Sequence, residues 1–253
     1  MMFYAMRNFL FKVETSVLLP IFSVFTIAVI VVSCALQPTE LALEALKNDQ
    51  TVIVETTPDF IAFRPKAPIA IRTGFIFYPG GLVEEKAYSP LCRAIAEQGF
   101  FVVITPVPFK LAVFNPFVAL PVIHEMRFIR AWAIGGHSLG GAMAARFVYE
   151  DSTRCKGLVL YASYPDGSNN LSKRNIRVLS ISASLDGLAT PATIERNKQF
   201  LPPQTRYIVL EGGNHAQFGN YGKQNRDNDA TMSAEEQQRR TVEETVRFLQ
   251  TLR

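Results

Sequence analysis

One serine stands in a sequence setting that would make it a nucleophile. Gly136, Ser138 and Gly140 form a Gly-x-Ser-x-Gly pattern. Residues 132–135 before it are apolar enough for a buried strand, and residues 142–147 after it favour a helix. A sharp strand-to-helix turn strains the serine backbone and exposes its hydroxyl, and the helix start favours developing negative charge. We therefore predict Ser138 to be a nucleophile; the alternative is a glycine-rich turn with a capping serine.

A serine hydroxyl needs a base within hydrogen-bonding distance, and the chain has three histidines. His215 directly follows the last predicted strand, 206–210, and is the predicted base. His137 adjoins the serine, and on such a turn its side chain should point away, which favours a role in packing. His124 lies in a proline-interrupted segment and is more typical of a surface histidine.

The base in turn needs an acid that fixes its tautomer. Asp186 follows the predicted strand 178–182 and completes the chain order Ser, Asp, His. Asp166 follows the preceding strand and is the weaker candidate. Either residue could instead be a turn aspartate that accepts hydrogen bonds from its own backbone.

Attack on a carbonyl creates an oxyanion, which needs backbone donors. The amide of Leu139, directly after the nucleophile, is the first expected donor. The loop 79–82 follows a predicted strand and should supply the second, with Gly81 preferred over Leu82. For this loop the alternative is a plain Pro-Gly turn.

The elements that must hold these residues alternate along the chain. Apolar runs predict strands at 51–55, 60–63, 73–78, 100–105, 132–135, 157–162, 178–182 and 206–210. Helices are expected over 87–98, after Ser138, from Thr190-Pro191 onward and after Ser233, with a broken helix over 110–127. This alternation predicts an α/β domain with a mostly parallel sheet, whose site lies at the carboxyl ends of the strands.

The expected C-terminal helix begins with a capping signal. Ser233 and Glu236 are spaced as a capping box, and Val242, Val246 and Leu249 should face the core. Before this helix, residues 223–231 have low hydrophobicity and are expected to form an exposed loop.

Composition limits the possible functions. The chain has 253 residues, 48% of them hydrophobic and 19% charged, enough for one sizeable core. The net charge is +4, but the basic residues are spread out, which argues against nucleic-acid binding. The spacing of Cys92 and Cys155 does not suggest a metal site; two unpaired, half-buried thiols are favoured over a disulfide. No cofactor and no metal are expected.

An uncharged apolar run occupies residues 17–36, which is long enough to span a bilayer. Arg7 and Lys12 precede it, whereas Glu40 and Glu44 follow it. The positive-inside tendency then leaves the N-terminus in the cytoplasm and the rest of the chain outside.

Four interpretations of this run stay open. It could be an uncleaved anchor or a cleaved signal. Residues 31–34 resemble a bacterial lipobox, which would mean cleavage before Cys34 and a lipid on that cysteine. A buried helix of the domain is the fourth. We predict a signal or membrane-anchor segment over 1–36, a helical connector over 37–50 and the folded domain over 51–253, attached to a bacterial membrane on its exocytoplasmic side.

Four motifs together resemble the α/β-hydrolase superfamily. They are Tyr78-Pro79-Gly80-Gly81, residues 136–141, Ser184-Leu185-Asp186-Gly187 and Gly212-Gly213-Asn214-His215. Over 51–253 the chain is most similar to small, lidless bacterial members of the dienelactone-hydrolase-like kind. The resemblance implies the α/β-hydrolase fold, with an eight-stranded, mostly parallel sheet and helices on both faces. It also implies a triad of Ser138, Asp186 and His215, with Gly81 and Leu139 as oxyanion donors.

One departure bears on the substrate. Dienelactone hydrolases proper use a cysteine nucleophile, whereas this chain has serine at 138. Only about fifteen residues separate the strands at 157–162 and 178–182, too few for a cap domain. We therefore expect an open, shallow site bordered by residues 109–117, Phe218 and Tyr221.

Such a site favours short acyl esters or thioesters, cleaved through an acyl-enzyme intermediate. Two other functions stay open: a membrane-tethered binding protein with an idle triad, and a peptidase of the same fold.

Overall fold

The computed structural model describes residues 35–66 and 73–252. The predicted membrane-associated run lies almost wholly outside these ranges, as does the lipobox cysteine, so both stay predictions. Within the described ranges, no helix is both long enough and apolar enough to cross a bilayer.

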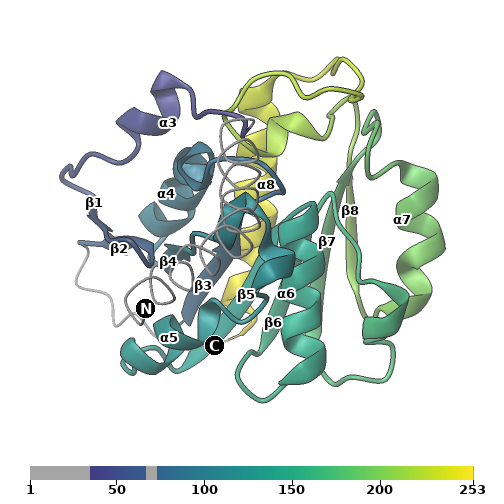
Figure 1. Cartoon of the computed structure of the whole chain (residues 1–253), viewed down its shortest axis with the longest axis horizontal. Coiled ribbons are helices and arrows are strands. Elements are labelled where there is room, and N and C mark those ends of the chain that lie inside the picture. Colours follow the sequence, from purple (N-terminus) through teal and green to yellow (C-terminus); the bar gives the residue numbers. More distant parts are fainter. Residues whose placement is uncertain (1–34, 67–72, 253) are drawn as a thin grey trace, which may run out of the picture. The chain divides into compact units, whose positions relative to one another are not determined.

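An eight-stranded sheet in the order β1-β2-β4-β3-β5-β6-β7-β8 forms the centre of the domain (Figure 1). The pairs β1–β2 and β2–β4 are antiparallel, and every other neighbouring pair is parallel. The strands are β1 Val52–Thr56, β2 Ile61–Pro65, β3 Thr73–Tyr78, β4 Phe101–Ile104, β5 Ala131–His137, β6 Gly157–Tyr161, β7 Arg177–Ala183 and β8 Arg206–Leu210. The predicted mostly parallel sheet is confirmed.

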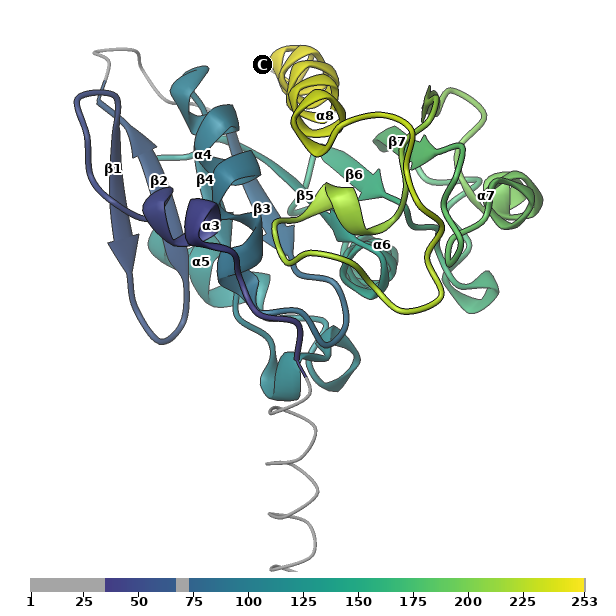
Figure 2. The ribbon, with the colours of Figure 1, turned by 90° about the horizontal axis from the view of Figure 1, so that it is seen from above.

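Helices cover both faces of this sheet, as Figure 2 shows for α8 and α6. They are α3 Glu40–Glu44, α4 Ser89–Glu97, α5 Ala119–Glu125, α6 Leu139–Glu150, α7 Pro191–Asn197 and α8 Ala234–Gln250. Alternate residues of β3 enter two separate cores: Phe75 and Phe77 pack with α4 and α8, whereas Ile76 and Tyr78 pack with α5 and α6.

The segment between β4 and β5 matches the expectation of a broken helix. It contains the 3-10 turns Pro108–Lys110 and Ala112–Phe114, followed by the short helix α5. Pro116 lies between the second turn and α5, and Pro121 falls in the first turn of α5, where a missing N–H is tolerated. Between β6 and β7 the only regular helical element described is the 3-10 turn Gly167–Asn169, so the fold carries no cap domain there.

The two cysteines of the domain lie in opposite cores. Cys92 belongs to the core under α4 and Cys155 to the core under α6. Both are unpaired, as favoured, but they are fully buried rather than half-buried. Burial raises the pKa of the Cys155 thiol to about 12 and that of Cys92 well above its usual value, so both stay protonated.

Helix α8 begins at the predicted cap, because the Ser233 hydroxyl accepts a hydrogen bond from the Glu236 amide at 3.2 Å. Leu249 is buried as expected, whereas Val242 and Val246 are only partly buried. The helix face turned to the sheet also carries buried polar side chains spaced four residues apart: Gln237, Thr241 and Thr245.

Candidate active site

Ser138 occupies the sharp turn between β5 and α6. Its backbone has φ 53° and ψ −125°, a strained conformation for a residue with a side chain. Three hydrogen bonds hold it: the Ser138 amide donates to Tyr161 O at 2.9 Å, while Ser138 O accepts from the Ala142 amide and from the Ser163 hydroxyl. The strand-turn-helix context predicted for Ser138 is therefore present.

The glycines of this motif are required by the approach of α6 to the end of β3. A Cβ at Gly136 would lie 2.4 Å from Tyr78 O, and one at Gly140 would lie 2.2 Å from Pro79 O. Both contacts are with backbone atoms, which cannot move aside without shifting the strand. Hydrogen is the only substituent that fits at either position.

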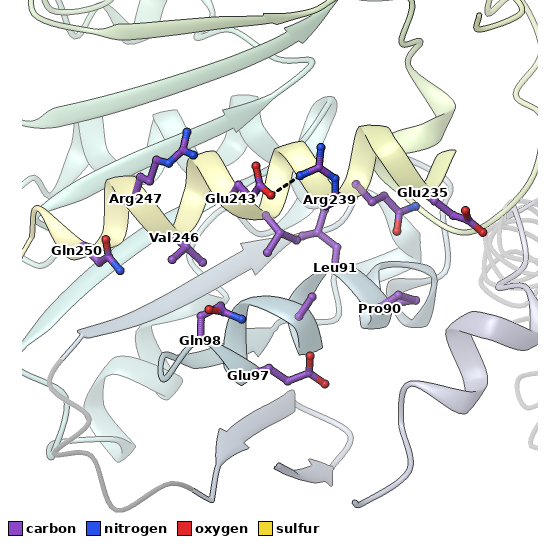
Figure 3. Close-up of a pocket in the computed structure, with 13 residues that line it drawn as sticks. Pro90, Leu91, Glu97, Gln98, Glu235, Arg239, Glu243, Val246, Arg247 and Gln250 are labelled. Carbon is purple, nitrogen blue, oxygen red and sulfur yellow. Dashed lines mark hydrogen bonds and ion pairs between the residues drawn. The ribbon is translucent and has the colours of Figure 1, made fainter. Parts of the chain in front are cut away.

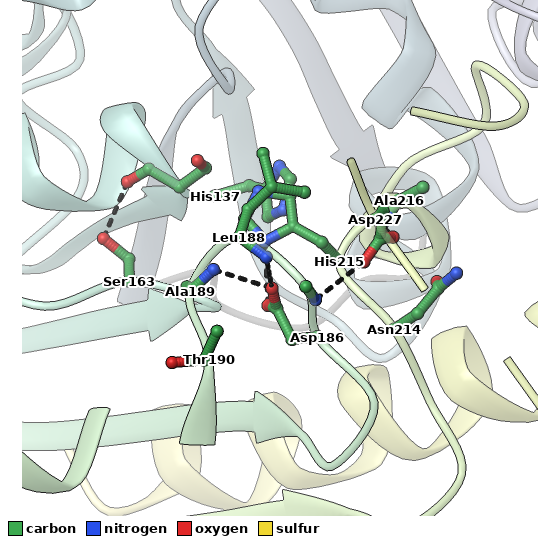
Figure 4. A network of polar contacts seen from close by, with 12 residues as sticks. His137, Ser163, Asp186, Leu188, Ala189, Thr190, Asn214, His215, Ala216 and Asp227 are labelled. Carbon is green, nitrogen blue, oxygen red and sulfur yellow. Dashed lines mark hydrogen bonds and ion pairs between the residues drawn. The ribbon is translucent and has the colours of Figure 1, made fainter. Parts of the chain in front are cut away.

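His215 begins the turn after β8 and is paired with Asp186 from the loop after β7 (Figure 4). The His215 Nδ1 to Asp186 Oδ2 distance is 2.8 Å, and both side chains are buried. Asp186 Oδ1 accepts hydrogen bonds from the amides of Leu188 and Ala189 at 2.8 and 2.7 Å. When Nδ1 carries the hydrogen that bonds to Asp186, His215 Nε2 has a free lone pair and can accept a proton.

A pocket of about 360 Å³ brings the serine and the histidine to one wall. Ser138 and His215 both line it, with Leu139, Met143, Tyr164 and Leu188 among the other lining residues. His215 Nε2 is buried and has no hydrogen-bond partner in the described part of the chain, and no hydrogen bond joins it to the Ser138 hydroxyl there. Such bonds are often long before substrate binds.

Asp166, the weaker candidate for the acid, also lines this pocket but has a different role. Its carboxylate caps its own turn, because Oδ1 accepts hydrogen bonds from the amide and the hydroxyl of Ser168 at 2.9 and 2.6 Å. Asp166 thus bonds only within its own turn, as far as the described residues show, whereas Asp186 also contacts His215.

The two preferred oxyanion donors are neighbours. A Cβ at Gly81 would lie 3.1 Å from the Leu139 side chain. Neither the Gly81 nor the Leu139 amide donates a hydrogen bond to any residue in the described ranges. The Leu82 amide, by contrast, donates to Lys110 O at 2.8 Å and is not available. Only Gly81 of this loop therefore combines a free amide with contact to Leu139.

His137 is buried, in agreement with the expected packing role, but it also contacts the base. Its ring centroid lies 4.4 Å from that of His215. His137 Nδ1 is 2.9 Å from the Tyr88 hydroxyl, within hydrogen-bonding distance, and the same hydroxyl accepts a hydrogen bond from the Gly80 amide. Burial lowers the pKa of His137 well below its usual value, and the neighbouring His215 lowers it further. His137 is therefore neutral.

Asp227 is the residue that sequence analysis missed. It lies in the loop 223–231, where we expected only exposed residues, yet its carboxylate reaches the site. Oδ1 accepts from the Gly187 amide at 3.0 Å and Oδ2 accepts from the Ala216 amide at 2.8 Å. Asp227 thus joins the residue after Asp186 to the residue after His215. An aspartate in a polar loop carries no local signal for such a contact.

The expected border of the site needs correction. Phe218 and Tyr221 are buried residues of the core under α8. The Phe218 ring stacks on that of Tyr161. Phe109 and Phe114 are exposed but do not line the pocket. His124 lies away from the site, with its Nε2 3.0 Å from Arg154 on the surface, as predicted.

A larger groove of about 620 Å³ runs between α4 and α8 (Figure 3). Its floor includes Leu91 and Val246, and its charged rim is already paired, with Arg239 bound to Glu236 and Glu243. No nucleophile or histidine lines it. In residues 35–66 and 73–252, no three His, Cys, Asp or Glu side chains gather where they could hold a metal ion.

Comparison with known proteins agrees with this geometry. The family model described as "Alpha/beta hydrolase family" matches residues 74–239. The crystal structure of a predicted CIB-like hydrolase from Thermoplasma acidophilum is similar in fold, with a TM-score of 0.58 at 13% identity over 78% of this chain and 99% of that one. No curated protein sequence matches the chain. The resemblance found in the sequence motifs is confirmed: the chain belongs to the α/β-hydrolase family.

Proposed function

We propose that the protein is a serine hydrolase that cleaves carboxylic esters with short acyl groups, or the corresponding thioesters. The observation that carries the proposal is the buried pair of His215 and Asp186, whose free Nε2 belongs to the same pocket as Ser138. Membership of the α/β-hydrolase family supports hydrolytic chemistry.

In the proposed reaction, Ser138 Oγ bonds to the acyl carbon and its proton passes to His215 Nε2. Asp186 stabilises the resulting imidazolium through Nδ1. The amides of Gly81 and Leu139 donate to the oxyanion. When the tetrahedral intermediate collapses, the leaving alcohol takes the proton from Nε2, and an acyl-serine remains. Water, deprotonated by His215 Nε2, then attacks the acyl carbon. The bond from the acyl carbon to Ser138 Oγ breaks, Oγ takes the proton back from Nε2, and the acid is released.

Pocket size supports the preference for short acyl groups. At about 360 Å³ the pocket is at the small end of ligand sites, and no cap domain in the described chain extends it. Its walls near Ser138 are apolar, with Leu139, Met143 and Leu188. Acetyl and butyryl groups fit such a space better than long chains.

For the N-terminal segment we propose attachment to a bacterial membrane, with the domain on the exocytoplasmic side. Support comes from the sequence: the apolar run at 17–36 and the basic residues before it. The proposed partners are thus a small-molecule ester and the membrane itself, without nucleic acid.

Covalent labelling tests the enzyme assignment. A fluorophosphonate probe should label wild type and fail to label Ser138→Ala, while Ser152→Ala, at the far end of α6, should label normally. Wild type should also cleave acetyl and butyryl aryl esters faster than long-chain ones. A folded wild type that takes up no probe would favour the binding-protein alternative. Label retained by Ser138→Ala would reject Ser138 as the nucleophile.

A further inference from the structure

An exposed apolar patch lies in the turns after β4, which we call the 108–114 patch. It consists of Phe109, Val113 and Phe114, whose exposed fractions are 47%, 46% and 62%. The two phenyl rings meet edge to face with centroids 5.5 Å apart. Because β3, β4 and β5 are parallel, the turns after β4 lie at the same edge of the sheet as the Gly81 loop and Ser138.

Charge is kept out of this patch. Lys110 is the only charged residue between 108 and 114. It is largely buried, with its Nζ 2.8 Å from Glu84 and 2.7 Å from Glu85. Contiguous apolar side chains exposed without charge mark surfaces that contact another apolar phase.

The beginning of the described chain is hydrogen-bonded to the same edge. The Leu36 amide donates to Leu82 O at 2.8 Å, and Leu36 O accepts from the Glu84 amide at 3.0 Å. The Leu82 amide in turn donates to Lys110 O at 2.8 Å. Backbone bonds therefore connect Leu36 to the Gly81–Leu82 loop and that loop to the 108–114 patch. Figure 2 shows the purple start of the described ribbon at this edge of the domain.

The position of Leu36 limits how the domain meets a membrane. Leu36 is also the last residue of the predicted apolar run, and it is already hydrogen-bonded to the Leu82 loop, so the predicted connector 37–50 does not lie between the run and this edge. An uncleaved anchor brings the bilayer to this point, and a lipid on Cys34 brings it within two residues, about 7 Å of extended chain. Under either form of attachment, the domain has too little free chain to turn a different edge toward the bilayer.

We propose that the 108–114 patch inserts into the interfacial layer of the bilayer, so that the sheet edge carrying Ser138 faces the membrane surface. Exposed phenyl rings beside a membrane attachment point act as the second, weaker anchor that peripheral proteins commonly need. The substrates of the site are then esters presented at the bilayer–water boundary. The inference about the surface rests on the proposed membrane attachment, and the substrate class rests on the proposed hydrolase activity.

Fluorescence quenching tests the surface without requiring catalysis. Full-length Phe114→Trp and Phe128→Trp variants are placed in phosphatidylcholine nanodiscs with and without brominated acyl chains. Phe128 is the matched control, since it is 51% exposed but precedes the amino end of β5, at the opposite edge of the sheet. Trp132 is buried and contributes the same background to both.

Brominated lipid should quench the Phe114→Trp signal at least twofold more than that of Phe128→Trp. Equal quenching in the two variants would overturn the proposal, as would recovery of the full-length chain from cells in a lipid-free, water-soluble form. The measurement works equally well on a Ser138→Ala background. A failure of ester hydrolysis therefore leaves this result standing, and the two proposals fail separately.

Activity gives a second readout. In a Phe109→Ser/Phe114→Ser double variant, hydrolysis of a fluorogenic ester dissolved in phosphatidylcholine vesicles should fall about tenfold. Hydrolysis of soluble p-nitrophenyl butyrate should stay within twofold of wild type, because neither phenylalanine lines the pocket. Equal losses on both substrates would count against the membrane contact.

Discussion

His137 shows how one side chain joins the parts of the candidate site. It precedes Ser138 at the end of β5, lies within hydrogen-bonding distance of the Tyr88 hydroxyl, and its ring is tilted against that of His215 with centroids 4.4 Å apart. The Tyr88 hydroxyl also accepts a hydrogen bond from the amide of Gly80, the residue before the proposed oxyanion donor Gly81. A protonated His137 would place a second positive charge beside the imidazolium that His215 forms in the proposed reaction. The site therefore depends on His137 staying uncharged.

We predict that this residue makes stability pH-dependent. The unfolded histidine has a pKa of about 6.5, and the folded pKa lies well below it. As pH falls through 6.5, the unfolded state gains a proton that the folded state does not bind, so the free energy of unfolding decreases. Between pH 7.5 and 5.5 wild type should lose about 1 kcal/mol more than His137→Gln, measured by urea unfolding. Equal losses in the two proteins would contradict this assignment.

At the scale of elements, the site depends on two loops that are held by a third. Asp186 belongs to the loop after β7 and His215 to the loop after β8. The 223–231 loop ties them together through Asp227, and Asn228 O accepts from the Asn214 side chain at 2.7 Å. The 223–231 loop thereby fixes the positions of the two loops that carry Asp186 and His215.

Loss of this connection should slow turnover without weakening substrate binding. In Asp227→Ala, the amides of Gly187 and Ala216 lose their common acceptor, and kcat should fall about tenfold because small misplacements of catalytic groups are costly. KM should change less than twofold. Asp227→Asn keeps one acceptor oxygen and should lose less.

The matched control is Asp229→Ala in the same loop. Asp229 pairs only with Lys223 on the surface and should leave kcat unchanged. Similar losses in Asp227→Ala and Asp229→Ala would mean that the loop, rather than its contact with the two amides, sets the rate.

At the scale of the whole molecule, the domain has one sheet between two cores, and α8 closes one of them. The buried polar side chains of α8 join it to the rest of the fold. Gln237 binds both the amide and the carbonyl of Asn214, next to His215. Thr245 donates to Thr241 O and so accepts from the buried Tyr161 hydroxyl at 2.6 Å.

This docking contact is testable by stability. In Thr245→Val, the Tyr161 hydroxyl loses its acceptor inside the core, which should lower the free energy of unfolding by about 2 kcal/mol. Thr241→Val removes only a hydroxyl that donates to Gln237 O within α8, and should cost under about 1 kcal/mol. Urea unfolding of both variants checks the difference.

Combining Thr245→Val with Tyr161→Phe removes both partners, so most of the stability should return. A double variant as unstable as the sum of the two single ones would mean that the hydroxyls do not interact energetically.

The sequence by itself determined the strands, the helix after Ser138 and the family. Apolar runs bounded by turn residues locate β3 and β5 within about two residues, because a strand buried on both faces needs continuous hydrophobic side chains. Gly136 and Gly140 must be glycine because the end of β3 lies close to them, but the Gly-x-Ser-x-Gly pattern that reveals this need spans only one turn of the sequence. The caps at Thr190 and Ser233 are local to their own helices, and they marked the helix starts correctly.

Only the tertiary structure decided which distant groups meet. Asp186 and Asp166 each follow a strand and precede a glycine, so the local sequence does not distinguish them. Asp186 contacts His215 and Asp166 caps its own turn because the end of β8 places His215 beside Asp186. The contacts of Asp227, the Tyr88–His137 bond and the polar stripe of α8 join segments many residues apart. Hydrophobic periodicity indicates which face of a helix or strand is buried, but it does not indicate which polar group of a distant segment will contact that helix or strand.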